Sequence, residues 1–128
     1  MGGYLLDTHA AIWFFMGDDK LSDTAQRIIE DLSNSVYVSV VSAWELAIKI
    51  SIGKLRFPGN TTGFTLMAQD NNIIILPIET AHLAVLEGLP FHHRDPFDRL
   101  IAATAFAEKM KLITADENIT RYDVPLVW

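Results

Sequence analysis

Four acidic residues have types and spacing that suit metal chemistry: Asp7, Glu45, Asp98 and Asp116. Three of them follow a predicted strand within four residues, and Asp98 lies at the start of the longest predicted helix. In a parallel sheet such positions converge on one edge, where α/β proteins bind their ligands. Converging carboxylates repel one another unless cations neutralise them, and hard oxygen ligands select Mg²⁺ or Mn²⁺. Two such ions could activate a water and stabilise the leaving oxygen of a phosphodiester.

Each acid also has a purely structural interpretation. Asp7 could cap the helix that begins near His9, and Asp116 could cap a short segment at residues 117–122. Asp98 falls at the third position of a helix that Asp95 caps and a proline opens, where an acid favours the helix dipole.

The structural alternative is strongest for Glu45. Ser42-Ala43-Trp44-Glu45 has the pattern of a capping box at the start of a helix, and Lys49 lies one turn later as an ion-pair partner. The joint distribution of the four acids, rather than any single position, therefore favours the metal-site interpretation.

The elements that would position these acids alternate between short apolar strands and helices. Strands are predicted at residues 3–6, 36–41, 73–76 and 112–114, with a short fifth at 125–127. Helices are predicted at residues 10–16, 21–32, 42–53, 62–69, 80–87 and 96–110. The strands are apolar along their whole length, so we expect helices on both faces. The pattern implies βαβ units and a three-layer α/β/α sandwich around a parallel sheet.

Composition restricts the class of protein further. The 128 residues suit one domain, 1–128, and half of them are hydrophobic. There is no cysteine, which excludes disulfides and zinc-thiolate sites and fits a reducing compartment. The apolar runs are too short for a membrane helix, and the N-terminus does not resemble a secretory signal. We therefore expect a soluble, cytoplasmic domain without a membrane partner.

Four segments of the chain carry a family resemblance. They contain the four acids and occur in the order Tyr4-Leu5-Leu6-Asp7-Thr8-His9-Ala10, Val41-Ser42-Ala43-Trp44-Glu45-Leu46, Asp95-Pro96-Phe97-Asp98-Arg99-Leu100-Ile101-Ala102-Ala103-Thr104-Ala105 and Leu112-Ile113-Thr114-Ala115-Asp116. The segments resemble the PIN domain and, more closely, the VapC-type toxins of bacterial and archaeal toxin–antitoxin pairs. The resemblance covers essentially the whole chain, and the ordered set is far more specific than any one segment.

The resemblance implies a five-stranded parallel sheet in the order 3-2-1-4-5 and Mg²⁺- or Mn²⁺-dependent RNA cleavage. It assigns Asp7, Glu45, Asp98 and Asp116 as catalytic metal ligands, with Thr8 and Thr114 as small polar residues that support them. His9 and Asp95 belong to the pattern of the closer subgroup.

We therefore hypothesise a metal-dependent endoribonuclease that hydrolyses RNA with a metal-activated water, acting as a toxin. Asp7, Glu45 and Asp98 would hold the principal ion, and Asp116 would bind it directly or through water. A phosphatase with an aspartate nucleophile is an alternative, but that chemistry generally needs a second acid where this chain has His9. A phosphoacceptor receiver domain would need a lysine just after a late strand, and Thr114-Ala115-Asp116 contains none. A PIN scaffold that only binds a partner remains open.

Cations are sparse enough to suggest where RNA would bind. The net charge of −6 argues against broad, nonspecific nucleic-acid binding. Arg94, Lys54 and Arg56 are the candidates for contacting RNA phosphates. Arg99 is expected instead to pair with Asp95 one helical turn before it.

The segment Ile12-Trp13-Phe14-Phe15-Met16 is apolar all round a short helix. Burial of most of it in the core is the default interpretation, although such a helix cannot easily bury every side. The family resemblance implies a homodimer and a cognate antitoxin protein whose helix occupies a groove near this segment.

Overall fold

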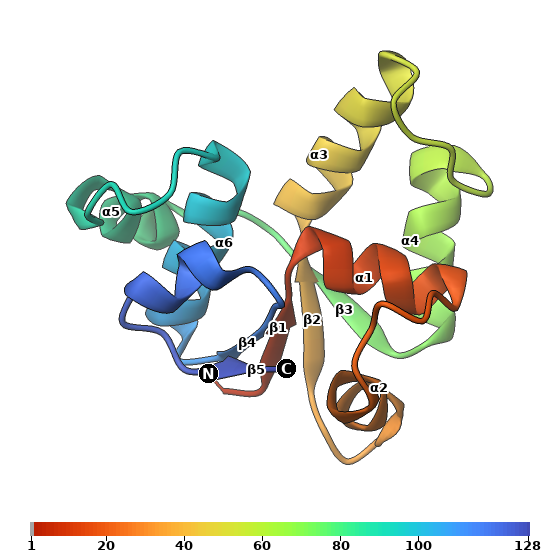
Figure 1. The fold of residues 1–128 in the computed structure, drawn as a ribbon, viewed down its shortest axis with the longest axis horizontal. Coiled ribbons are helices and arrows are strands. Elements are labelled where there is room, and N and C mark those ends of the chain that lie inside the picture. Colours follow the sequence, from red (N-terminus) through yellow and green to blue (C-terminus); the bar gives the residue numbers. More distant parts are fainter. Residues whose placement is uncertain (1) are drawn as a thin grey trace.

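The computed structural model describes residues 2–128, apart from the side chains of residues 120 and 121. Five strands form one parallel sheet in the order β3-β2-β1-β4-β5 (Figure 1). The strands are β1 (Tyr4–Leu6), β2 (Val36–Ser39), β3 (Ile73–Leu76), β4 (Lys111–Ile113) and β5 (Leu126–Val127). The predicted fold class and strand order are confirmed.

Six α-helices and one 3₁₀-helix connect the strands among the described residues. They are α1 (Thr8–Met16), α2 (Asp23–Glu30), α3 (Val40–Ser51), α4 (Asn60–Asp70), α5 (Thr80–Gly88), α6 (Pro96–Glu108) and the 3₁₀-helix η1 (Glu117–Arg121). Each predicted helix is present, and the ends differ from the prediction by a few residues at most. None of the helices in the described part of the chain is long and apolar enough to cross a bilayer.

The start of α3 corrects one prediction that bears on the acids. Val40 and Val41, which their β-branched side chains assigned to a strand, already belong to the helix. Ser39 caps this helix, because its hydroxyl accepts a hydrogen bond from the backbone N–H of Val41 at 3.0 Å. Ser42 therefore lies inside α3, and the predicted capping box with Glu45 is wrong.

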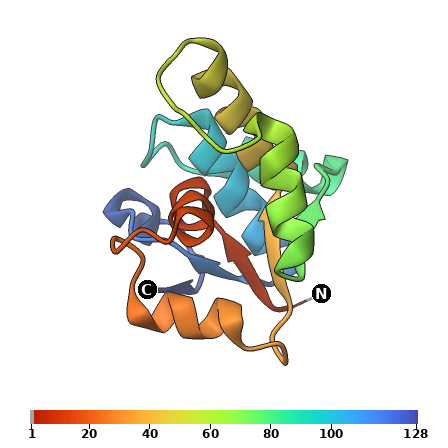
Figure 2. The ribbon, with the colours of Figure 1, turned by 90° about the vertical axis from the view of Figure 1, so that its right-hand side faces the viewer.

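Two apolar clusters lie on opposite faces of the sheet, because successive strand residues point to opposite sides. Leu6 and Ile113 pack with α1, α2, α3 and α4, whereas Leu5 and Leu112 pack with α6. Figures 1 and 2 show the same division, with α5 and α6 on one side of β1 and α1, α2 and α4 on the other. The edge strand β3 departs from the expectation of burial on both faces, since Ile74 is half exposed.

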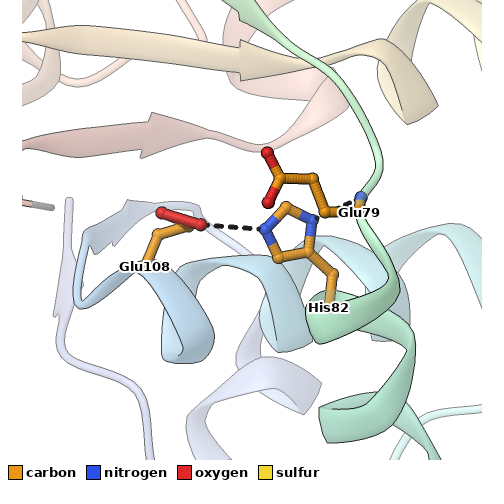
Figure 3. A group of neighbouring side chains, drawn as sticks. All are labelled: Glu79, His82 and Glu108. Carbon is orange, nitrogen blue, oxygen red and sulfur yellow. Dashed lines mark hydrogen bonds and ion pairs between the residues drawn. The ribbon is translucent and has the colours of Figure 1, made fainter.

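The buried residue His82 joins α5 and α6, the two helices on the face of the sheet that carries Leu5 and Leu112. His82 Nδ1 accepts a hydrogen bond from the backbone N–H of Glu79, and Nε2 lies 3.1 Å from Glu108 Oε1 (Figure 3). The proton must therefore be on Nε2, which donates to the carboxylate. Because both ring nitrogens are already used and the ring is fully buried, this cluster ties the start of α5 to the end of α6.

Candidate metal centre

Asp7 follows β1 directly and both of its carboxylate oxygens accept hydrogen bonds. Oδ1 accepts from the backbone N–H of Ala10 at 2.8 Å, so the predicted helix cap is confirmed. Oδ2 accepts from the hydroxyl of Thr114, at the end of β4. Burial raises the pKa of Asp7 and outweighs these hydrogen bonds, which lower it. The residue is thus both a cap and a buried carboxyl at the carboxyl edge of the sheet.

Two threonines connect the elements that carry the acids. Besides donating to Asp7, Thr114 accepts a hydrogen bond from the backbone N–H of Asp116 at 3.0 Å. The hydroxyl of Thr8, at the start of α1, lies 2.9 Å from that of Ser42, one turn before Glu45 on α3. Both threonines are buried, so these contacts fix the spacing between β1, α3 and β4 at the point where the acids meet.

Glu45 is buried and only half of its carboxylate has a partner. Oε2 pairs with Lys49 Nζ at 3.0 Å, which confirms the predicted ion pair. Oε1 has no hydrogen-bond partner among the described residues, although it is shielded from solvent. A buried polar atom without a partner costs free energy, so an oxygen of this kind is expected to have a ligand.

Asp98, in the first turn of α6, also has a strongly perturbed carboxyl group. Burial, followed by the negative charges of Asp95 and Glu45, raises its pKa to about 7, while nearby His93 acts in the opposite direction. Asp95 caps α6 as predicted, because its Oδ1 accepts from the backbone N–H groups of Phe97 and Asp98. Because Asp95 provides the cap, the carboxyl of Asp98 is not needed for capping α6 and pairs with His93 instead.

His93 is a site residue that the sequence analysis did not single out. Its Nε2 lies 2.9 Å from Asp116 Oδ2 and 3.1 Å from Asp98 Oδ2. Its Nδ1 accepts from the backbone N–H of Asp95, so the Nε2 proton points at the two carboxylates. Its position two residues before the helix cap in His92-His93-Arg94-Asp95 is the sequence signal that could have indicated it.

Asp116 caps η1 through the backbone N–H of Asn118 at 2.9 Å, as predicted. Partial burial is the largest single influence on its pKa and raises it. The hydrogen bonds from His93 and Asn118 outweigh that influence, so the pKa is lowered overall. His93 Nε2 and carboxylate oxygens of Asp98 and Asp116 lie within 4.8 Å of one another.

The four predicted acids therefore come together from four elements. Asp7 and Asp116 line one hollow, and the charges of Glu45 and Asp7 both raise the pKa of Asp98. Three observations fit a divalent cation bound between them: the unpartnered Glu45 oxygen, the raised pKa of Asp98 and a donor set of hard oxygens.

The structure places the cations that the sequence analysis named at different distances from the acids. Arg94, Lys54 and Arg56 are exposed, but the last two follow the end of α3 that is remote from the strand edge (Figure 1). The predicted pairing of Arg99 with Asp95 is wrong. Arg99 is buried and donates to the backbone oxygen of Pro90 and the hydroxyl of Tyr122, because the Asp95 carboxylate is used by the cap.

The hydrogen bonds of Arg99 and Tyr122 also hold the backbone of His93 in position. The hydroxyl of Tyr122 also accepts a hydrogen bond from the backbone N–H of His93 at 3.1 Å. Arg99 and Tyr122 thus hold the loop before α6 against the 3₁₀ segment, and that loop carries His93 to the acids.

A parallel sheet in the order 3-2-1-4-5 with acids from β1, α3, α6 and the β4 end converging at its carboxyl edge defines a PIN-like α/β protein. The PIN domain family model matches residues 4–125, so the chain belongs to the PIN domain family.

Individual relatives agree with this assignment. The chain is 28% identical over 122 residues to "Ribonuclease VapC22" of Mycobacterium tuberculosis, covering 94% of this chain and 92% of the relative. VapBC2 from Rickettsia felis, solved bound to a DNA fragment from its promoter, superposes with a TM-score of 0.77 at 21% identity, covering 100% of this chain and 99% of that one. DNA-bound VapBC from Salmonella typhimurium superposes with a TM-score of 0.70 at 17% identity, covering 99% and 98%. These structural similarities show the shared fold.

Proposed function

We propose that this PIN-domain protein is a metal-dependent endoribonuclease that acts as the toxin of a toxin–antitoxin pair. The observation that carries the proposal is the cluster of four carboxylates in which one oxygen of Glu45 has no partner among the described residues and the pKa of Asp98 is raised to about 7. Membership of the PIN family and the similarity to a protein named as a ribonuclease support RNA as the substrate.

Asp7, Glu45 and Asp98 would hold a Mg²⁺ or Mn²⁺ ion, and Asp116 would bind it directly or through water. When bound, such an ion supplies an activated water and neutralises charge on the phosphodiester. Thr114 keeps Asp7 and Asp116 together, and Thr8 keeps α3 in position beside them. His93 donates its Nε2 proton to Asp98 and Asp116 and thereby orients both carboxylates.

The test is cleavage of a single-stranded RNA with Mn²⁺, with Mg²⁺ and with EDTA. Asp98→Asn is compared with wild type, and Asp70→Asn, at an exposed acid on α4, serves as a matched control. We expect cleavage by wild type and Asp70→Asn only with a divalent ion, and none by Asp98→Asn. Cleavage in EDTA, or full activity of Asp98→Asn, would contradict the proposal.

We further propose a cognate antitoxin protein and a homodimer in the cytoplasm. The structural neighbours solved as VapBC assemblies support the first of these partners. Helix α1 offers only part of its surface, because residues 12–15 pack against the core as the sequence analysis expected, and Met16 is half exposed. Coexpression with the product of the adjacent gene tests the partner, since a true antitoxin co-purifies and suppresses cleavage. Light scattering on the isolated chain tests the dimer.

A further inference from the structure

A hollow of about 240 Å³ opens directly beside the acids. Its walls are Asp7, His9, Trp13, Ala115 and Asp116, so two of the proposed metal ligands form one side of it. His9 and Trp13 form the other side, because residues four apart lie on the same face of α1. Neither aromatic residue has a role in the proposed metal chemistry.

The Trp13 ring is held in place by its surroundings, and the His9 ring lies against it. The ring centroids of His9 and Trp13 are 5.7 Å apart with an interplanar angle of 38°. Trp128, at the end of β5, meets Trp13 edge-on at 5.9 Å, and Trp13 also packs against the first core cluster. The indole is therefore a fixed wall rather than a mobile surface side chain.

Charge around the hollow separates two kinds of contact. Where no metal ion neutralises them, the carboxylates of Asp7 and Asp116 disfavour a phosphate inside the hollow, whereas an uncharged flat ring suits its aromatic wall. A cation lies near this aromatic wall: Lys20 Nζ is over the Trp13 ring, 6.0 Å from its centroid. Proteins that bind single-stranded RNA combine these two features, with aromatic side chains stacking on bases and cations following the backbone.

We propose that this hollow is a nucleobase-binding subsite, in which a base of the RNA strand next to the scissile phosphate stacks on Trp13 and His9. The proposal rests on the proposed ribonuclease function. Lys20 contacts the backbone phosphate of the same nucleotide. Stacking of this kind tolerates any base, because every base has a π-face. The subsite therefore sets where the strand lies relative to the acids rather than which sequence is cut.

The first experiment pairs a protein change with an RNA change. RNA whose cleavage site has been mapped is remade with a single abasic nucleotide at each position flanking that site. We expect wild type to lose about tenfold in kcat/KM at one abasic position. Trp13→Leu should lose about as much on intact RNA and nothing more at that abasic position. Trp44→Leu, at an exposed tryptophan of α3, is the matched control and should behave as wild type.

Thermal melts establish that each variant is folded, and His9→Ala, at an exposed position, gives a second variant if Trp13→Leu does not fold. If the loss in kcat/KM caused by Trp13→Leu or His9→Ala multiplied the loss caused by the abasic nucleotide at every position, the subsite would be overturned. The proposed nuclease function would be unaffected by that result. A Trp13→Leu variant that cleaves like wild type but escapes inhibition by the antitoxin would also overturn the subsite, because the hollow would then bind protein.

A second measurement does not depend on cleavage. In a Trp44→Phe background the tryptophans that remain are Trp13 and Trp128, so fluorescence reports on the hollow. We expect AMP and UMP to quench this fluorescence and ribose 5-phosphate to leave it unchanged. Quenching without RNA cleavage would contradict the proposed function and support the subsite, whereas equal effects of ribose 5-phosphate and AMP would overturn the subsite.

Discussion

Two histidines in this protein make the same local contacts in different surroundings. In both His82 and His93, Nδ1 accepts a backbone N–H and the Nε2 proton points at carboxylate. His82 faces Glu108 and joins α5 to α6, with its ring fully buried. His93 faces Asp98 and Asp116 beside two more acids and remains partly accessible.

The number of converging charges, and not the hydrogen-bond pattern, distinguishes the proposed metal site around His93 from the structural cluster around His82. His82 donates to the carboxylate of Glu108, and the Glu79 carboxylate that also lies near its ring belongs to an exposed residue. Around His93 a single donor is shared by two carboxylates, and the pKa of Asp98 remains raised to about 7. The excess negative charge at the second cluster is what an added cation would neutralise.

The largest expected difference in RNA cleavage is between a variant in the acid-rich cluster, which consists of His93 and the four acids around it, and a variant in the cluster around His82. Asp7→Asn should lower RNA cleavage at least about 100-fold, because it replaces a proposed metal ligand, and even outer partners of ligands contribute about 10–100-fold. Glu108→Gln should cleave like wild type. Single-turnover cleavage with Mn²⁺ measures both, and equal losses in the two variants would erase the functional distinction between the clusters.

The histidines themselves give the next test. His93→Ala should reduce cleavage by about 10–100-fold through misplaced carboxylates. His93→Gln should restore much of it, since its amide can donate in place of Nε2. His82→Ala should keep the wild-type rate per folded molecule. Failure of His93→Gln to recover any activity would show that His93 does more than orient Asp98 and Asp116.

The same two histidine variants should rank in the opposite order when the free energy of unfolding is measured in place of cleavage. His82→Ala leaves a buried cavity and leaves the backbone N–H of Glu79 without its partner, at an expected cost of about 2 kcal/mol in the free energy of unfolding. His93→Ala should cost less, because its ring reaches solvent. Urea unfolding in EDTA compares the two, and a larger loss for His93→Ala would contradict the structural role of His82.

Stability of the metal-free protein should also depend on pH through the acid-rich cluster. The pKa of Asp98 is about 7 in the folded protein against the ordinary value of 3.8. Its contribution to stability is therefore full below about pH 4 and is lost as the pH rises through about 7. The raised pKa of Asp7 acts in the same direction. Thermal melts in EDTA at pH 5 and pH 8 should show the decline, and Asp98→Asn should flatten it. Glu108→Gln should decline as wild type does.

The smallest effect should come from an exposed cation near the acid-rich cluster. Arg94→Gln should weaken RNA binding modestly and reduce the slope of log affinity against log salt by about one unit. Binding titrations at several salt concentrations, with divalent ions absent, measure this slope. An unchanged slope would remove Arg94 from the proposed RNA contacts.

Much of the fold could be predicted, because the hydrophobic pattern and residue propensities of short segments indicate the helices and strands. The run Ile73–Leu76 is β-branched and apolar, and it is a strand over the same residues. The first turn of α3 was missed for a similar local reason. Val40 and Val41 favour strands by propensity, but the Ser39 hydroxyl caps a helix there and Val41 packs into the second core cluster.

The four acids could be proposed from sequence because each follows a strand or opens a helix that a parallel sheet brings to one edge. The partners of those acids could not. His93 and Asp116 are 23 residues apart, Thr114 and Asp7 are 107 apart, and no local pattern links them. The hollow between His9, Trp13 and Asp116 likewise exists only once η1 and α1 have packed beside the same strand ends.

Periodicity and capping chemistry, which act over a few residues at a time, were enough to predict the helices, the strands and the caps at Asp7, Asp95 and Asp116. The strand order and the assignment of the four acids as metal ligands came from the resemblance of the ordered motifs to the PIN domain. Which carboxylate oxygens have partners, which histidine faces the acids and where a base could stack became visible only in the folded chain. Those properties depend on burial and on distances between side chains from different elements, and packing alone sets both.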